Sequence, residues 1–167
     1  GLWKGLWFSV FHAISAFCNA GFDITGNSFM DYNGSPITII TLSLLIIFGG
    51  LGFGVIIDIW RHRSWQRLSL HSKLVIIISA LLILLGTILI LALEWGNPAT
   101  IKDLPLSEKI LASLFAAIVP RTAGFNSIDV GSMLQTSAFL TIVLMFIGGS
   151  PGSTAGGIKT STIGVIF

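Results

Sequence analysis

Long apolar stretches alternate with short polar segments along the whole chain. Three stretches, residues 36–60, 74–95 and 133–167, are long enough to cross a bilayer, which takes about 20 apolar residues as a helix. Residues 6–17 and 108–119 are also apolar, but at about 12 residues each they are typical of core or re-entrant helices rather than spans. The pattern therefore predicts an all-α membrane protein.

The third long stretch is interrupted by a segment that is unfit for a helix. Residues 148–160 read Gly-Gly-Ser-Pro-Gly-Ser-Thr-Ala-Gly-Gly-Ile-Lys-Thr, with apolar residues on both sides. Broken backbone at membrane depth is tolerated only where protein or a water-filled cavity surrounds it, because each unpartnered group costs several kcal/mol in hydrocarbon. Lys159 supports this reading, since ionisable residues inside membrane segments mark ion or substrate paths. The break indicates a protein that moves something across a membrane.

The chain also contains an internal repeat, which constrains the architecture strongly. Each short apolar helix is followed by a turn ending in Ala-Gly-Phe, at residues 19–22 and 122–125, and then by a polar linker and a long apolar helix. Residues 74–167 hold one complete helix–pore-loop–helix unit whose second helix is broken. Residues 1–60 hold a partial unit with a re-entrant helix, a turn and a spanning helix, and residues 61–73 join the two.

The glycine in each turn suggests how a cation is held. A re-entrant helix points its negative C-terminal end toward the membrane centre, and a glycine such as Gly21 or Gly124 adopts backbone conformations closed to other residues. Rings of backbone carbonyls replace the hydration shell of potassium in selective filters. A single turn of this kind is more typical of a helix cap, but two copies in the same context favour pore loops. A filter typically needs four such turns, so two must come from elsewhere.

Composition and charge agree with this class. Hydrophobic residues make up 53% of the chain, charged residues 10%, and the mean hydropathy is +0.92, whereas a soluble domain carries roughly 25% charged residues. The net charge of +2 is too small to suggest nucleic acid, and the single cysteine, Cys18, allows no internal disulfide. Four of the nine basic residues lie between positions 61 and 73, so the positive-inside rule places that loop in the cytoplasm.

Three charged or titratable side chains are expected to have structural roles. His12 is expected to be a packed side chain with a hydrogen-bond partner, and Asp58 to pair with Arg61 one turn further on. Arg121 precedes a turn that would hold cations, so we expect it to point away from the ion and to anchor its loop. Lys159 has a second interpretation, in which it only extends toward the inner interface.

Three strings of residues resemble the Trk/Ktr/HKT superfamily of potassium transporters, most closely its bacterial Ktr and Trk branch. They are Phe-His-Ala-Ile-Ser-Ala-Phe-Cys-Asn-Ala-Gly-Phe at 11–22, Arg-Thr-Ala-Gly-Phe-Asn at 121–126, and the glycine-rich segment at 148–160. The resemblance covers essentially the whole chain, and the third string is highly specific. It implies four helix–pore–helix repeats around one pore, of which this chain would supply the second half of repeat two and all of repeat three.

The resemblance also implies which residues form the site. Gly21 and Gly124 would be filter glycines that bind K⁺ through backbone carbonyls. The implied filter residues are Asn19, Ala20, Gly21, Thr122, Ala123 and Gly124. The implied residues of an intramembrane gate loop are Gly148, Gly149, Ser150, Pro151, Gly152, Ser153, Thr154, Ala155, Gly156, Gly157 and Lys159.

The function implied is potassium movement down its electrochemical gradient through a plasma-membrane protein that carries no covalently bound cofactor. Whether sodium is coupled to this movement or stimulates it stays open. The implied partners are membrane lipid, a second copy in a homodimer, and a cytosolic nucleotide-binding regulatory ring. The basic loop at 61–73 is a candidate contact for that ring or for anionic lipid. No residues resemble a nucleophile with its base, so an enzyme is not expected.

Two other classes stay open from the sequence. A secondary transporter with discontinuous helices also places broken helices near the midplane, although the second Ala-Gly-Phe turn argues against it. A non-transporting assembly or regulatory protein with the same fold is the other. Residues 148–160 resemble a phosphate-binding loop in the interval between Gly152 and Gly157, but Ile158 intrudes before Lys159 and no strand is expected before the segment.

Overall fold

The chain folds into helices joined by ordered turns. The computed structural model describes residues 1–32 and 34–166, with the backbone alone for residues 165–166. Within these residues there is no strand, only an isolated bridge between Ile147 and Ile158. The α-helices are α1 (Leu2–Phe17), α2 (Pro36–Leu51), α3 (Phe53–His62), α4 (Leu70–Glu94), α5 (Leu106–Ile118), α6 (Gln135–Phe146) and α7 (Thr160–Ile166).

Helix α4 is the one described helix that is long and apolar enough to cross a bilayer alone. Only 22% of its most apolar window is buried, and Leu81, Leu84 and Ile88 are exposed on its surface. Its 25 residues make it about 37 Å long, more than the thickness of a bilayer's hydrocarbon core. The outward apolar surface is that of a membrane-spanning helix.

The stretch at 36–60, expected as one continuous span, is instead two helices. Helices α2 and α3 are bent by 96° at a break, where Gly52 has φ 84° and ψ 150°. That backbone conformation is closed to other residues, and a Cβ at Gly52 would lie 2.7 Å from Ser150 Oγ and 2.9 Å from the Pro151 carbonyl oxygen. The expectation of an unbroken span is therefore wrong, because the glycine-rich loop packs into the bend.

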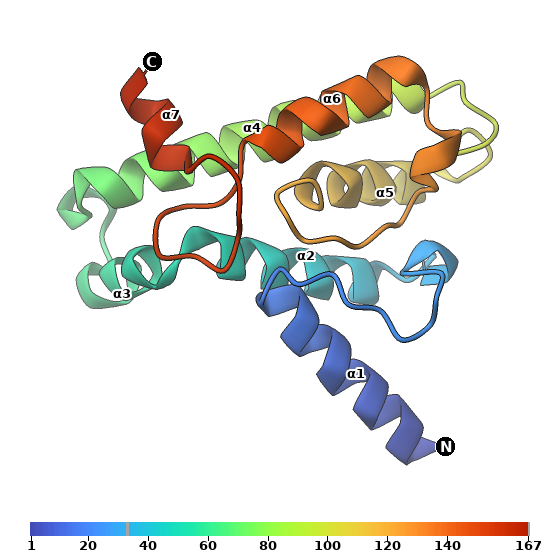
Figure 1. Cartoon of the computed structure of the whole chain (residues 1–167), viewed down its shortest axis with the longest axis horizontal. Coiled ribbons are helices and arrows are strands. Elements are labelled where there is room, and N and C mark those ends of the chain that lie inside the picture. Colours follow the sequence, from blue (N-terminus) through green and yellow to red (C-terminus); the bar gives the residue numbers. More distant parts are fainter. Residues whose placement is uncertain (33, 167) are drawn as a thin grey trace.

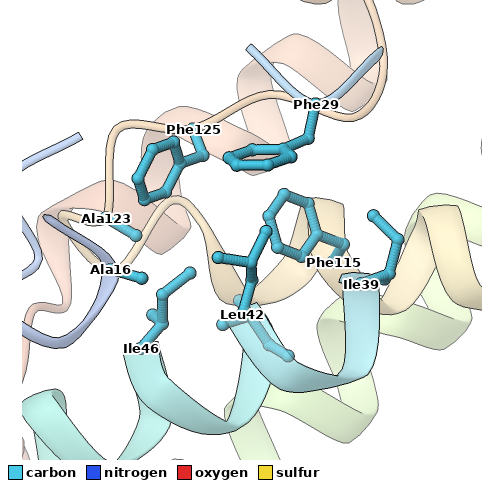
Figure 2. Packing of buried hydrophobic residues seen from close by; sticks show 9 residues of the cluster. Ala16, Phe29, Ile39, Leu42, Ile46, Phe115, Ala123 and Phe125 are labelled. Atoms are coloured by element: carbon cyan, nitrogen blue, oxygen red, sulfur yellow. The ribbon is translucent and has the colours of Figure 1, made fainter. Parts of the chain in front are cut away.

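Helix α5 lies against both α2 and α4, while the N-terminal half of α1 leaves the bundle (Figure 1). The core beneath the two Ala-Gly-Phe turns is aromatic and aliphatic, and Figure 2 shows it from close by. Phe29 and Phe125 face Phe115 from α5 and Leu42 from α2 (Figure 2). The cluster comprises Ala16, Phe29, Ile39, Leu42, Ile46, Phe115, Ile118, Ala123 and Phe125. Both turns are thus mounted on one shared core.

The third long stretch is broken, as its glycines and proline predict. Helix α6 ends at Phe146, and α7 begins at Thr160. The base of the loop between them is closed by two backbone bonds, from Gly148 N to Ile158 O (3.0 Å) and from Ile158 N to Phe146 O (3.1 Å). In Figure 1 this red loop descends from α6 to the junction of α2 and α3. Phe167, where the expected stretch ends, lies outside the described residues.

Candidate functional site

The two Ala-Gly-Phe turns have the same backbone. Asn19 and Gly21 have φ of 49° and 69°, and Thr122 and Gly124 have φ of 71° and 75°. Left-handed residues thus occur two positions apart in both turns, and the first of them lies two residues after the end of α1 and four residues after the end of α5. The repeat seen in the sequence extends to the conformation of individual residues.

The two turns also touch each other. A Cβ built on Gly21 would lie 2.7 Å from Gly124 Cα and 2.8 Å from Ala123 O, and a Cβ on Gly124 would lie 2.8 Å from Gly21 Cα. Any side chain at either position would therefore meet the backbone of the other turn. The residues at 19–21 and 122–124 are brought together into one site, and glycine is required at both of its closest points.

The segments that follow the turns are tied to each other. Phe29 N donates to Asn126 O at 2.9 Å, and Asn126 N donates to Ser28 Oγ at 2.8 Å. The rings of Phe29 and Phe125 pack edge to face, with centroids 5.3 Å apart. These contacts between residues about 100 positions apart hold the two turns in fixed relation.

His12 is a packed side chain with partners, as expected. It is 2% exposed, and its ring nitrogens lie 3.0 Å from Asp23 Oδ1 and 2.8 Å from Phe8 O. Burial alone would raise the pKa of Asp23, but hydrogen bonds from Thr25, His12 and Ser28 outweigh it and hold that pKa below its ordinary range. This ionised carboxylate organises the segment that follows the first turn.

The glycine-rich loop completes the end of α2. Ser150 N donates to Gly50 O at 3.0 Å, Thr154 N donates to Gly49 O at 3.3 Å, and Ser150 Oγ donates to Leu51 O. The last carbonyls of a helix have no partner within it, so the loop supplies the missing donors. The loop and the break in α2–α3 therefore form one structure.

The same loop contacts both turns. Asn19 Nδ2 donates to Thr154 Oγ1 at 2.8 Å, and Thr154 Oγ1 donates to Phe17 O at 3.1 Å. Gly156 N donates to Thr122 Oγ1 at 3.0 Å. Each turn is thus bound to the loop through the side chain of its first left-handed residue.

Lys159 and Arg121 both have partners close to the site. Lys159 Nζ donates to Ala155 O at 2.7 Å, which ties the loop to itself. The Arg121 side chain is 7% exposed and donates to Ser79 Oγ on α4 at 3.0 Å. Arg121 therefore anchors its turn to the neighbouring helix, as expected.

Asp58 does not make the pair expected for it. Its carboxylate lies 2.7 Å from His62 Nδ1 and accepts bonds from Ser69 N (3.0 Å) and Ser69 Oγ (2.8 Å). Among the described residues it forms no ion pair with Arg61. The chain reverses at Arg63, where φ is 48°, and this brings the start of α4 against Asp58.

Two structural features were not predicted from the sequence. Gly52 stands in the run Gly49-Gly50-Leu51-Gly52-Phe53-Gly54, and that density of glycine inside an apolar stretch was a usable signal for a break. Glu94 is fully buried and accepts bonds from Asn97 Nδ2 (2.7 Å), Thr100 Oγ1 (2.7 Å) and Leu134 N (2.9 Å). It thereby ties the end of α4 to the start of α6, a role with no local sequence signal.

Comparison with known proteins agrees with this architecture. Residues 2–167 match the family TrkH, described as cation transport protein. The chain is 45% identical over 164 residues to the potassium/sodium uptake protein NtpJ of Enterococcus hirae, covering 98% of this chain and 36% of that protein. It is 43% identical over 164 residues to the Ktr system potassium uptake protein B of Bacillus subtilis, covering 98% and 37%.

A solved structure shares the fold. The potassium transporter TrkH from Vibrio parahaemolyticus superposes with a TM-score of 0.72 at 21% identity, over 91% of this chain and 32% of that one. The chain thus spans about a third of the length of the relatives it matches. The family match extends over nearly every residue, so this chain belongs to the TrkH family of cation transport proteins, which are membrane proteins.

Proposed function

We propose that this chain supplies two pore turns of a potassium-conducting pathway through the plasma membrane, and that the loop at 148–159 gates it. The observation that carries the proposal is the contact between two glycine turns of identical backbone handedness, each at the end of a short helix. We infer the identity of the ion from the names of two relatives, since those from Enterococcus hirae and Bacillus subtilis are named as potassium uptake proteins.

The filter would work through the backbone. The C-terminal ends of α1 and α5 carry the negative ends of their helix dipoles, and carbonyls at Gly21 and Gly124 would replace part of the hydration shell of K⁺. The guanidinium of Arg121 donates to Ser79 on α4, so its positive charge is fixed at that neighbouring helix. A positive charge that is fixed there supports a cation-binding role for the turn. The other turns of the ring would come from the rest of the protein.

The loop suits a gate because it is docked by hydrogen bonds rather than by a packed apolar face. Ser150, Thr154 and Gly156 bond to α2 and to both turns. Displacing such a loop costs less than moving packed helices and can be biased by a partner. Opening would leave the helices in place.

We also propose which ion is coupled to potassium movement and which partner regulates the pathway. The name of the Enterococcus hirae relative includes sodium, which makes Na⁺ the candidate coupled or stimulating ion. Two relatives are named as potassium uptake proteins of a Ktr system, which supports a membrane subunit that works with another component. We propose that this subunit is a homodimer surrounded by lipid and that the other component is a cytosolic nucleotide-binding regulatory ring. The exposed Arg61, Arg63 and Arg67 would offer that ring a positive surface between α3 and α4.

The experiment is potassium uptake in cells that lack their own uptake systems, using the complete protein that contains this chain. Gly124→Ser should lower the preference for potassium over sodium by about tenfold, or ~1.4 kcal/mol, because the side chain disturbs the carbonyls of both turns. Gly96→Ser is the matched control, since a Cβ there meets nothing within 4 Å. Uptake by Gly124→Ser with unchanged potassium preference would remove the filter assignment.

A further inference from the structure

We infer that Thr154 and Thr122 are positioning residues of the filter, so that the gate loop, while docked, sets ion selectivity as well as blocking the path. The inference rests on the proposed function above and goes beyond it, since a gate need not touch the filter it serves. Here the loop bonds to one residue of each turn, and in both turns it is the first left-handed residue.

The Thr154 hydroxyl both accepts and donates a hydrogen bond at the first turn. The oxygen accepts a hydrogen bond from Asn19 Nδ2 at 2.8 Å, and the hydroxyl hydrogen is donated to Phe17 O at 3.1 Å. Phe17 is the last residue of α1, so its carbonyl belongs to the helix end that would face a cation. One hydroxyl on the loop thereby fixes the side chain that begins the turn and occupies a carbonyl at the negative end of the helix.

Asn19 needs such a restraint. Its φ is 49°, a conformation that is rare for residues other than glycine, and its side chain is 8% exposed. Residues in sparsely populated backbone regions are strained and persist only where their surroundings fix them. The loop is one of those surroundings, together with α2, where a Cβ on Gly49 would lie 3.0 Å from Asn19 Nδ2.

Thr122 repeats the arrangement in the second turn. A β-branched residue with φ 71° is a stronger outlier than Asn19, and its hydroxyl accepts the bond from Gly156 N at 3.0 Å. The two loop contacts, at Thr154 and Gly156, are two residues apart on the loop. A single displacement of this short stretch releases both turns at once.

The consequence is a coupling between gate and filter. When the loop leaves, Asn19 and Thr122 lose partners that hold their left-handed backbone, the adjacent carbonyls gain freedom, and discrimination between K⁺ and Na⁺ falls. Coupling of this kind is reciprocal, so K⁺ in the filter favours the docked loop more than Na⁺ does. The preference of the filter for binding K⁺ over Na⁺ is therefore highest while the loop is docked.

The test compares Thr154→Val with Thr154→Ser in the purified complete protein, measuring the dissociation constants for K⁺ and Na⁺ by equilibrium titration and, separately, potassium flux in liposomes. Valine removes both hydrogen bonds at nearly constant volume, and serine keeps the hydroxyl. Thr154→Val loses both hydrogen bonds of the docked loop to the first turn, so the ratio of K⁺ affinity to Na⁺ affinity should fall about three- to tenfold. Thr154→Ser should stay close to wild type.

A second pair makes the test independent of folding at one site. Thr122→Val removes the acceptor of the Gly156 amide, and Thr122→Ser restores it; the same loss and rescue of the ratio are expected. A higher potassium flux in both valine variants with an unchanged ratio of K⁺ to Na⁺ affinity would overturn the inference while leaving the proposed gate intact. Equal ratios in the valine and serine variants would overturn it as well. A wild-type protein that takes up no potassium would instead refute the proposed function.

Discussion

Four residues with left-handed backbone define the site at the residue scale, and they divide into two kinds. At Gly21 and Gly124 the neighbouring turn leaves no room for a side chain. At Asn19 and Thr122 the side chain is needed, because it is the point at which the loop binds. Each turn therefore has a glycine at the contact and a hydrogen-bonding residue two positions earlier, and we propose this pair as its functional pattern.

The bend between α2 and α3 depends on a single residue, Gly52. Gly52→Ala should lower the free energy of unfolding by about 1–3 kcal/mol, the range for a strained backbone residue, since φ is 84° and Ser150 Oγ lies 2.7 Å from the added Cβ. Thermal unfolding of the purified complete protein measures this. Gly54→Ala is the control: a Cβ there meets nothing within 4 Å, and alanine is the better helix former. Equal stability of the two variants would show that the bend does not depend on Gly52.

Asp23 gives a pH dependence with a defined sign. Its folded pKa lies below the ordinary value, so its stabilisation is complete above the unfolded pKa of about 3.9 and is lost as pH falls through the folded pKa. The stability of wild type over Asp23→Asn should therefore be constant from pH 7 to pH 5 and should narrow below about pH 4. Thermal unfolding at several pH values measures this difference. A difference in stability between wild type and Asp23→Asn that is unchanged at pH 3 would contradict the role of the ionised carboxylate. His12 is the titratable group that faces this carboxylate.

At the scale of elements, the loop at 148–159 is a structural part of α2 as well as a candidate gate. It supplies donors to Gly49, Gly50 and Leu51 at the end of that helix. Water can replace these donors if the loop leaves, because a gated path is hydrated. The helix end can therefore survive loop displacement.

Deletion of residues 150–155 should raise potassium flux and make it less dependent on a regulatory subunit. The deletion removes Ser150 and Thr154, which carry the contacts to α2 and to the first turn. Initial rates of potassium uptake, with and without the regulatory subunit and normalised to protein in the membrane, measure the effect. A deletion variant that reaches the membrane and retains unchanged, regulated flux would remove the gate from the account.

The sequence predicted the elements better than the contacts between them. Periodicity and length indicated α4, α5 and the break after Phe146, because those signals are local. The bend at Gly52 was not predicted, since a glycine in an apolar stretch bends a helix only when a partner fills the bend, and that partner is Ser150, about 100 residues later. The pairing of Thr154 with Asn19 depends on the same long-range packing, so no local pattern reveals it.

In the molecule as a whole, the two ends of the membrane-spanning helix α4 lie at opposite faces of the membrane. Arg61, Arg63 and Arg67 precede its first residue, Leu70. The segment that follows its last residue, Glu94, carries Asp103 and Glu108 next to Lys102 and Lys109 and has no net charge. The proposed topology places the basic loop in the cytoplasm, so that α5 would enter from outside and the turns would lie on the outer side of the glycine-rich loop. The direction of the whole pathway depends on this orientation.

Cysteine labelling tests the orientation. In a Cys18→Ser background, a cysteine replacing exposed Ala99 should react with a membrane-impermeant thiol reagent in intact cells, whereas one replacing exposed Ser64 should react only after the cells are opened. Labelling is measured by mass shift of the complete protein. Reaction of the Ser64→Cys protein alone in intact cells would invert the topology.

The central claim is that the turns at Gly21 and Gly124 belong to one ion filter, and a flux measurement on purified protein tests it most directly. The complete protein is reconstituted into liposomes, and potassium and sodium flux are compared for wild type, Gly21→Ser, Gly124→Ser and the double variant. Because each added Cβ meets the backbone of the other turn, each single variant should lower the potassium preference, and the double variant should lower it by less than the product of the two effects. Wild-type liposomes without potassium flux, or single variants with unchanged preference, would contradict the account.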